Sequence, residues 1–145
     1  PSESLSQGLI PQLKSVVSGM TEADAVNFLL AFVQKGLRYK LDESQFNRAE
    51  KYLLPEETLL YLDSDCEDHS FLFAWLVRKV LNLQVIGLEY PGHIATAVRL
   101  NQAKGKLYRY QNQPYVVADS TYINATFGME MPLFAGKTVT LVPVN

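Results

Sequence analysis

The chain has 145 residues, of which 48% are hydrophobic, and this length predicts a single domain with one packed core. Its net charge is −2 and its 13 Lys and Arg residues are scattered, which excludes a basic stripe and predicts no nucleic-acid partner. No stretch approaches the roughly 20 apolar residues of a membrane span. A single cysteine excludes an internal disulfide and leaves the cytoplasm and the cell envelope both open as compartments.

The first half of the sequence predicts one clear helix. We interpret residues 1–20 as a loose lead-in segment before a domain of residues 21–145, because the stretch is only weakly amphipathic. Behind Thr21, a good N-cap residue, apolar side chains recur at helical spacing and predict a helix that ends near Lys35. Residues 37–60 carry scattered aromatic side chains and are expected to be irregular.

The second half predicts a buried helix followed by strands. Apolar side chains recur nearly all round a helix from Cys66 to about Leu81, which is typical of a buried helix. Beyond Asn82, β-branched and aromatic residues predict strands at 84–89, 93–100, 106–110, 115–119 and 138–144. Helices first and strands second predict an α+β domain in which an antiparallel sheet packs on the Cys66 helix.

The single cysteine lies at the start of this buried helix, in Asp65-Cys66-Glu67-Asp68-His69-Ser70. A lone cysteine is more often a small buried residue than a catalyst. A helix N-terminus, however, offers unpaired backbone N–H groups and a positive dipole, which favour a thiolate. The three acidic neighbours act in the opposite direction, so activation rests mainly on a histidine partner. We assign Asp65 to the N-cap and Asp68 to the N3 position, where carboxylates cap a helix.

A histidine and an aspartate follow at intervals that suit such a partner. His93 opens a predicted strand 27 positions after Cys66, and Asp119 ends a later strand 26 positions further on. An imidazole that is held by a carboxylate can activate a thiol nucleophile, although a surface turn is the competing interpretation of His93. For Asp119 to reach His93, their two strands must be antiparallel neighbours, so residues 106–112 must form an outer strand or an excursion. The other histidine, His69, is assigned to the surface or to a cap.

The three motifs together resemble a known family. The segment from Asp65 to Ser70, then Tyr90-Pro91-Gly92-His93-Ile94-Ala95-Thr96-Ala97-Val98, and then Val117-Ala118-Asp119-Ser120-Thr121-Tyr122, resemble the transglutaminase-like branch of the papain-like thiol fold. The likeness extends from about Ala25 to Pro132 and is greatest to domains at the C-terminal ends of bacterial proteins. It implies that Cys66 is the nucleophile, His93 the base and Asp119 the residue that orients the base. Ser64 and Ser120 replace a frequent Gly and Pro of the family, but neither change removes a reacting group.

We therefore predict a cysteine peptidase, amidase or transglutaminase that acts on a peptide or protein through a thioester and needs no cofactor. Gln34 is the candidate for a second oxyanion donor beside the Cys66 backbone N–H. Tyr39 and Tyr90 are candidates for the wall of a substrate cleft. The sequence begins at Pro1, which we interpret as a sign of a longer parent chain whose other domains are partners.

Two other functions are compatible with parts of this pattern. One is a noncatalytic module that binds a peptide or a neighbouring domain in the same cleft, although the intact Cys, His and Asp argue against it. The other is a metal site, but one Cys and two His without short paired spacings are a poor ligand set, so we predict no metal.

Overall fold

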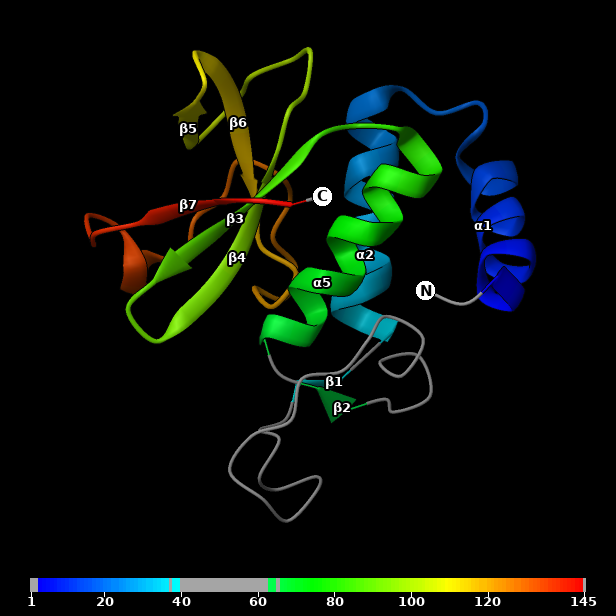
Figure 1. Cartoon of the computed structure of the whole chain (residues 1–145), viewed down its shortest axis with the longest axis horizontal. Coiled ribbons are helices and arrows are strands. Elements are labelled where there is room, and N and C mark those ends of the chain that lie inside the picture. The colour runs from blue at the N-terminus through cyan, green and yellow to red at the C-terminus, as the bar shows by residue number, and fades with distance from the viewer. Residues whose placement is uncertain (1–2, 37, 40–62, 65, 145) are drawn as a thin grey trace.

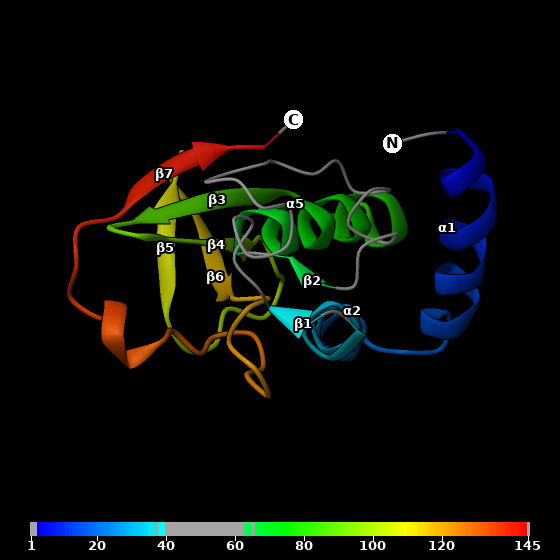
Figure 2. The ribbon, with the colours of Figure 1, turned by 90° about the horizontal axis from the view of Figure 1, so that it is seen from below.

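The computed structural model describes residues 3–36, 38–39, 63–64 and 66–144. Among these residues, three α-helices stand on one side of a five-stranded sheet, with α5 nearest the sheet and α1 farthest from it (Figures 1 and 2). This arrangement confirms the predicted α+β class. Most of the segment 37–60, which was predicted to be irregular, lies outside the described residues. The elements are α1 (Glu3–Val17), α2 (Glu22–Gly36), β1 (Arg38–Tyr39), β2 (Asp63–Ser64), α5 (Cys66–Leu76), β3 (Val85–Tyr90), β4 (His93–Val98), β5 (Leu107–Tyr110), β6 (Gln113–Ala118) and β7 (Thr140–Pro143).

The helix that begins at Cys66 is the centre of the core. Leu72, Phe73 and Leu76 have no exposed surface, so α5 is buried between the sheet and the other helices, as its apolar composition predicts. The helix continues through a π-helical turn, Val77–Leu81, and ends where it was expected to end. Asn82 then takes a left-handed conformation with φ 55°, which Asn tolerates better than most residues, and redirects the chain into β3.

The sheet has the strand order β5-β6-β4-β3-β7, and all neighbouring strands are antiparallel. Strand β6 therefore lies directly beside β4, with Thr96 opposite Ala118, although β5 precedes β6 in the chain. The hairpin of β5 and β6 places β5 at the outer edge. This order is the one required for Asp119, just beyond β6, to lie near His93 at the start of β4.

The N-terminal segment differs from the prediction, because residues 3–17 form the helix α1 instead of a loose lead-in. Ile10, Leu13 and Val17 are spaced three or four residues apart and are buried, and the first two belong to the same apolar cluster as α2 and α5. Pro11 inside the helix and the many polar residues around it obscured this pattern in the sequence. Among the described residues, no helix is both long enough and apolar enough to cross a membrane.

Candidate active site

The thiol of Cys66 stands at the first residue of α5 and is half-buried. The residues that follow it turn inward more than the sequence indicates. Asp68 is fully buried, and only 1% of His69 is exposed, so the assignment of His69 to the surface is wrong. Burial lowers the pKa of His69 to about 4, and the charge of Asp119 opposes this effect only in part. His69 is therefore neutral at neutral pH. Asp65, which was assigned to the N-cap of this helix, lies outside the described residues.

His93 is held at the start of β4 by a carboxylate. A turn through Pro91 and Gly92 precedes it, and Gly92 takes φ +76°, a conformation that glycine adopts without strain. The imidazole is 8% exposed, and its Nε2 lies 2.7 Å from Oδ2 of Asp119. The side chain of Cys66 is also close enough to this imidazole to raise its pKa. The structure thus brings Cys66, His93 and Asp119 together.

The proton of His93 is bound more tightly than that of a free histidine. Burial alone lowers the pKa of His93. The hydrogen bonds to Asp119 and Cys66, together with the charges of both groups, outweigh this effect and raise the pKa to about 9. At neutral pH the ring is thus mainly an imidazolium.

Both oxygens of the Asp119 carboxylate are engaged. Oδ2 faces His93, while Oδ1 accepts hydrogen bonds from the backbone N–H of Thr121 at 2.9 Å and from its hydroxyl at 2.8 Å. Such a turn around an aspartate is a familiar local motif, so the Thr two positions after Asp119 was a usable signal in the sequence. Thr121 thereby orients the carboxylate toward the imidazole.

Gln34 reaches the same corner of the domain from α2, but in a different way from the one predicted. Its side-chain Nε2 donates to the backbone carbonyl of Asp119 at 3.0 Å and to that of Ala125 at 3.1 Å, and the residue is 2% exposed. Both N–H bonds of the amide are thus used, and this geometry contradicts an oxyanion donor, which needs a free N–H. Gln34 instead fixes the backbone that carries Asp119.

An aromatic ring covers one face of the imidazole. Phe134, from the 3₁₀ turn Pro132–Phe134, stacks on His93 with ring centroids 4.5 Å apart and planes within 8°. Tyr90 lies beside both rings, with its centroid 5.9 Å from that of His93 and 5.4 Å from that of Phe134. No local pattern in the sequence indicated this role for Phe134, which lies 41 positions after the histidine that it covers.

The loop that carries Phe134 is anchored by a carboxylate between two phenols. Oε2 of Glu130 accepts hydrogen bonds from the hydroxyl of Tyr90 at 2.7 Å and from that of Tyr108 at 2.5 Å. Burial raises the pKa of both phenols, and the hydrogen bond to Glu130 raises them further. Only 5% of Tyr90 is exposed, so its ring packs beside His93 and Phe134 instead of forming the open wall that was predicted. The side chain of Tyr39 lies outside the described residues.

The arrangement contains the parts of a nucleophilic site. The imidazole lies between a thiol at a helix N-terminus and a fixed carboxylate. The backbone N–H groups of the first turn of α5 have no partners within the helix. In the described part of the chain, no three His, Cys, Asp or Glu side chains are grouped closely enough to hold a metal ion.

Comparison with solved structures identifies the fold. No protein-family model and no curated protein matches the chain. A transglutaminase matches 94% of it with a TM-score of 0.55 and 16% identity, and a candidate cysteine protease from Cytophaga hutchinsonii matches 100% with 0.53 and 12%. Legionella pneumophila LapG matches 92% of the chain with a TM-score of 0.50 and 10% identity. The chain spans 37%, 51% and 87% of the lengths of these three proteins. It has a transglutaminase-like fold.

Proposed function

We propose that this chain is a thiol hydrolase or acyltransferase, namely a cysteine peptidase, amidase or transglutaminase. In this proposal Cys66 is the nucleophile, His93 the general base and acid, and Asp119 the residue that orients the imidazole. The observation that supports it most is the His93 ring itself, which has Nε2 2.7 Å from the Asp119 carboxylate and a pKa that both Asp119 and Cys66 raise. A buried imidazole with these two neighbours is typical of thiol catalysis.

The chemistry follows from this order of groups. In the proposed resting state His93 already holds the proton as an imidazolium, so Cys66 attacks as a thiolate. Its sulfur forms a bond to the carbonyl carbon of a peptide or carboxamide while the C=O electron pair moves onto oxygen. Backbone N–H groups of the first turn of α5 stabilise this oxyanion. When the oxyanion collapses, the C–N bond breaks, and the leaving nitrogen takes the proton from His93 and departs as an amine or ammonia. The acyl group then remains on Cys66 as a thioester.

The thioester is resolved by a second nucleophile. Water or an amine gives up a proton to His93, now neutral, and attacks the acyl carbon. The C–S bond then breaks, and the sulfur leaves as a thiolate beside the re-formed imidazolium. Water gives hydrolysis, and an amine gives acyl transfer. Asp119 assists both halves, because it keeps a proton on Nε2 and stabilises the imidazolium that is present at rest and re-forms in the second half of the cycle. A carboxamide or peptide as substrate is consistent with the fold that this chain shares with a transglutaminase.

The first test measures the thiol itself. Cys66 is the only cysteine, so every iodoacetamide adduct in an intact mass spectrum reports on it. We expect rapid alkylation at pH 6 to 7, and a rate reduced about tenfold or more in His93→Gln, because the imidazolium beside the sulfur is lost. Asp24→Asn, which removes an exposed carboxylate at the first turn of α2, is the matched control and should react like the wild type. Equal rates in all three proteins would contradict an activated thiol.

The second test captures the intermediate. The protein is incubated with a library of peptide carboxamides, quenched in acid and weighed, and an acyl adduct is expected on Cys66. Hydroxylamine should remove the adduct as a hydroxamate, and an added primary amine should divert it if the protein is an acyltransferase. Cys66→Ser should form no thioester. Rapid alkylation without any acyl adduct would favour a noncatalytic peptide-binding module, because the thiol would be activated but unused.

A further inference from the structure

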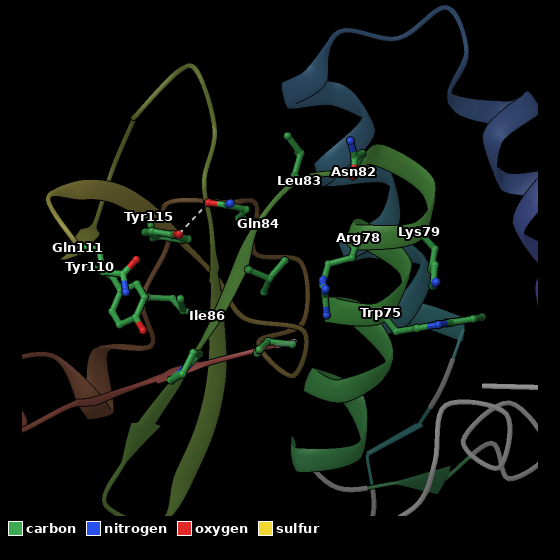
Figure 3. A pocket seen from close by; sticks show the side chains of 13 residues that line it. Trp75, Arg78, Lys79, Asn82, Leu83, Gln84, Ile86, Tyr110, Gln111 and Tyr115 are labelled. Carbon is green, nitrogen blue, oxygen red and sulfur yellow. Dashed lines mark hydrogen bonds between the residues drawn. The ribbon is translucent and has the colours of Figure 1, made fainter.

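A concave site lies at the other end of the helix that carries Cys66. It has a volume of about 840 Å³, within the range of ligand pockets, which is about 300–1,000 Å³. Its walls are the last turn of α5 with the π-helical turn, the first half of β3, the hairpin of β5 and β6, and the end of β7 with Val144 (Figure 3). Arg78 in this wall is 12 residues beyond Cys66, which places it about 18 Å further along the helix axis. We call this site the distal groove.

The charge of the distal groove is positive, although the chain as a whole has a net charge of −2. Arg78 and Lys79 belong to its wall, and none of its described lining residues is acidic. Within the described part of the chain, neither cation forms an ion pair or a side-chain hydrogen bond. Arg78 extends from the helix toward the strands, whereas Lys79 lies on the opposite side of the helix in the same view (Figure 3). Arg78 is therefore the cation that a ligand in the groove would meet first.

The rest of the lining is apolar and hydrogen-bonding. Val85 and Ile86 are buried in β3 beside it, and the ring of Tyr110 stands edge-on to that of Tyr115 at 6.0 Å. The hydroxyl of Tyr115 donates to Oε1 of Gln84 at 3.2 Å, so the amide nitrogen of this exposed Gln stays available as a donor. An arginine can pair with a carboxylate, while amide and aromatic groups suit a peptide backbone and an apolar side chain.

We propose that the distal groove binds an acidic peptide segment of another protein. A carboxylate of this segment pairs with Arg78, and an adjacent apolar side chain packs against Tyr110 and the apolar part of β3. A peptide is favoured over a free anion because a single carboxylate would occupy only the end of the groove near Arg78 and would leave its aromatic and amide surfaces unused. The inference does not depend on the thiol chemistry, since no residue of the groove belongs to the Cys66 site.

Isothermal titration calorimetry measures this binding directly. Trp75, the only tryptophan, is not used as a fluorescent reporter, because its side chain extends from the helix away from the strands, on the same side as Lys79 (Figure 3). The probe is a blocked tetrapeptide, Glu-Glu-Phe-Glu, and the comparison probe replaces each Glu by Gln. We expect saturable binding of the acidic peptide, at least tenfold weaker binding of the neutral one, and loss of affinity on raising salt from 50 to 500 mM, about 14 to 4 Å in Debye length.

Matched variants locate the binding. Arg78→Gln should lower the affinity for the acidic peptide at least tenfold, and Arg78→Lys should retain part of this affinity. Lys137→Gln, which removes an exposed cation outside the groove, should change the affinity less than twofold. Cys66→Ser should bind like the wild type, which separates this site from the proposed active site. Circular dichroism establishes that each variant is folded. Equal affinity in Arg78→Gln, equal binding of the neutral peptide, or equally tight binding of free glutamate or inorganic phosphate would each overturn the proposal.

Discussion

Replacing Asp119 by Asn removes the negative charge that holds the proton of His93 and keeps the size of the side chain. The rise of the His93 pKa from 6.5 to about 9 includes the contributions of Asp119 and Cys66 and is opposed by burial. At about 1.36 kcal/mol per pH unit, this rise corresponds to about 3 kcal/mol in favour of the imidazolium. In Asp119→Asn the burial stays and most of the compensation is lost, so we expect the pKa of His93 to fall to 6.5 or below.

The same change has a defined effect on stability. The folded-state pKa of His93 lies above its unfolded value, so its contribution is fully present below pH 6.5 and is lost as the pH rises through about 9. The unfolding free energy of the wild type should therefore fall by up to about 3 kcal/mol across this window. Asp119→Asn should show little of this dependence, and Asp24→Asn should follow the wild type.

Two measurements check these expectations. Chemical denaturation at half-unit pH intervals gives the unfolding free energy. NMR of the two imidazole rings gives the pKa directly, and the rings are easily distinguished because burial lowers the pKa of His69 to about 4. A wild-type His93 that titrates near 6.5 would refute the reasoning. So would a His93 that still titrates near 9 in Asp119→Asn, because the carboxylate would then contribute nothing.

Three further predictions concern the frame around the site. Leu13→Ala should lower the unfolding free energy by about 2–5 kcal/mol, because the side chain is 5% exposed in the main core, and a smaller loss in chemical denaturation would mean that α1 packs loosely. In Glu130→Gln the pKa of the Tyr108 phenol should fall, because the carboxylate that accepts its hydrogen bond and disfavours its ionisation is lost. NMR of labelled tyrosine rings would show this change. Gly128→Ala should lower the unfolding free energy by about 1–3 kcal/mol, because φ is +88° and an added Cβ would clash with the Lys104 carbonyl. A Cβ at Gly36 has no neighbour within 4 Å, so Gly36→Ala should change the unfolding free energy by less than about 1 kcal/mol.

The features that depend on local periodicity could be read from the sequence. The apolar spacing around Phe73 predicts a buried helix, and the β-branched residues beyond Asn82 predict strands whose positions agree with the structure within a few residues. The order of β4 and β6 followed from a chemical requirement, since Asp119 and His93 can meet only across neighbouring strands. In α1 the pattern was obscured by Pro11, whose presence in a helix is uncommon enough to mislead.

The features that depend on tertiary contacts could not be read in this way. The amide of Gln34 is used by the carbonyls of Asp119 and Ala125, which lie 85 and 91 positions away in the chain. His69 is buried because α5 turns that side of its first turn toward the interior, whereas a helical wheel shows only that it is polar. Phe134 reaches His93 through a loop whose path depends on Glu130, and no period or spacing encodes such a path.

The strand order has a consequence for the order in which the molecule is assembled. The pairs β3–β4 and β5–β6 are local hairpins. Strands β4 and β6 also pair directly, but β5 lies between them in the chain, so their pairing closes a longer loop. Local pairs form early in folding because less chain entropy is lost, so the contact between β4 and β6 is expected among the later events. His93 and Asp119 stay apart until that contact forms. A partly folded chain, including one still emerging from the ribosome, therefore carries a thiol that lacks its carboxylate-held imidazole.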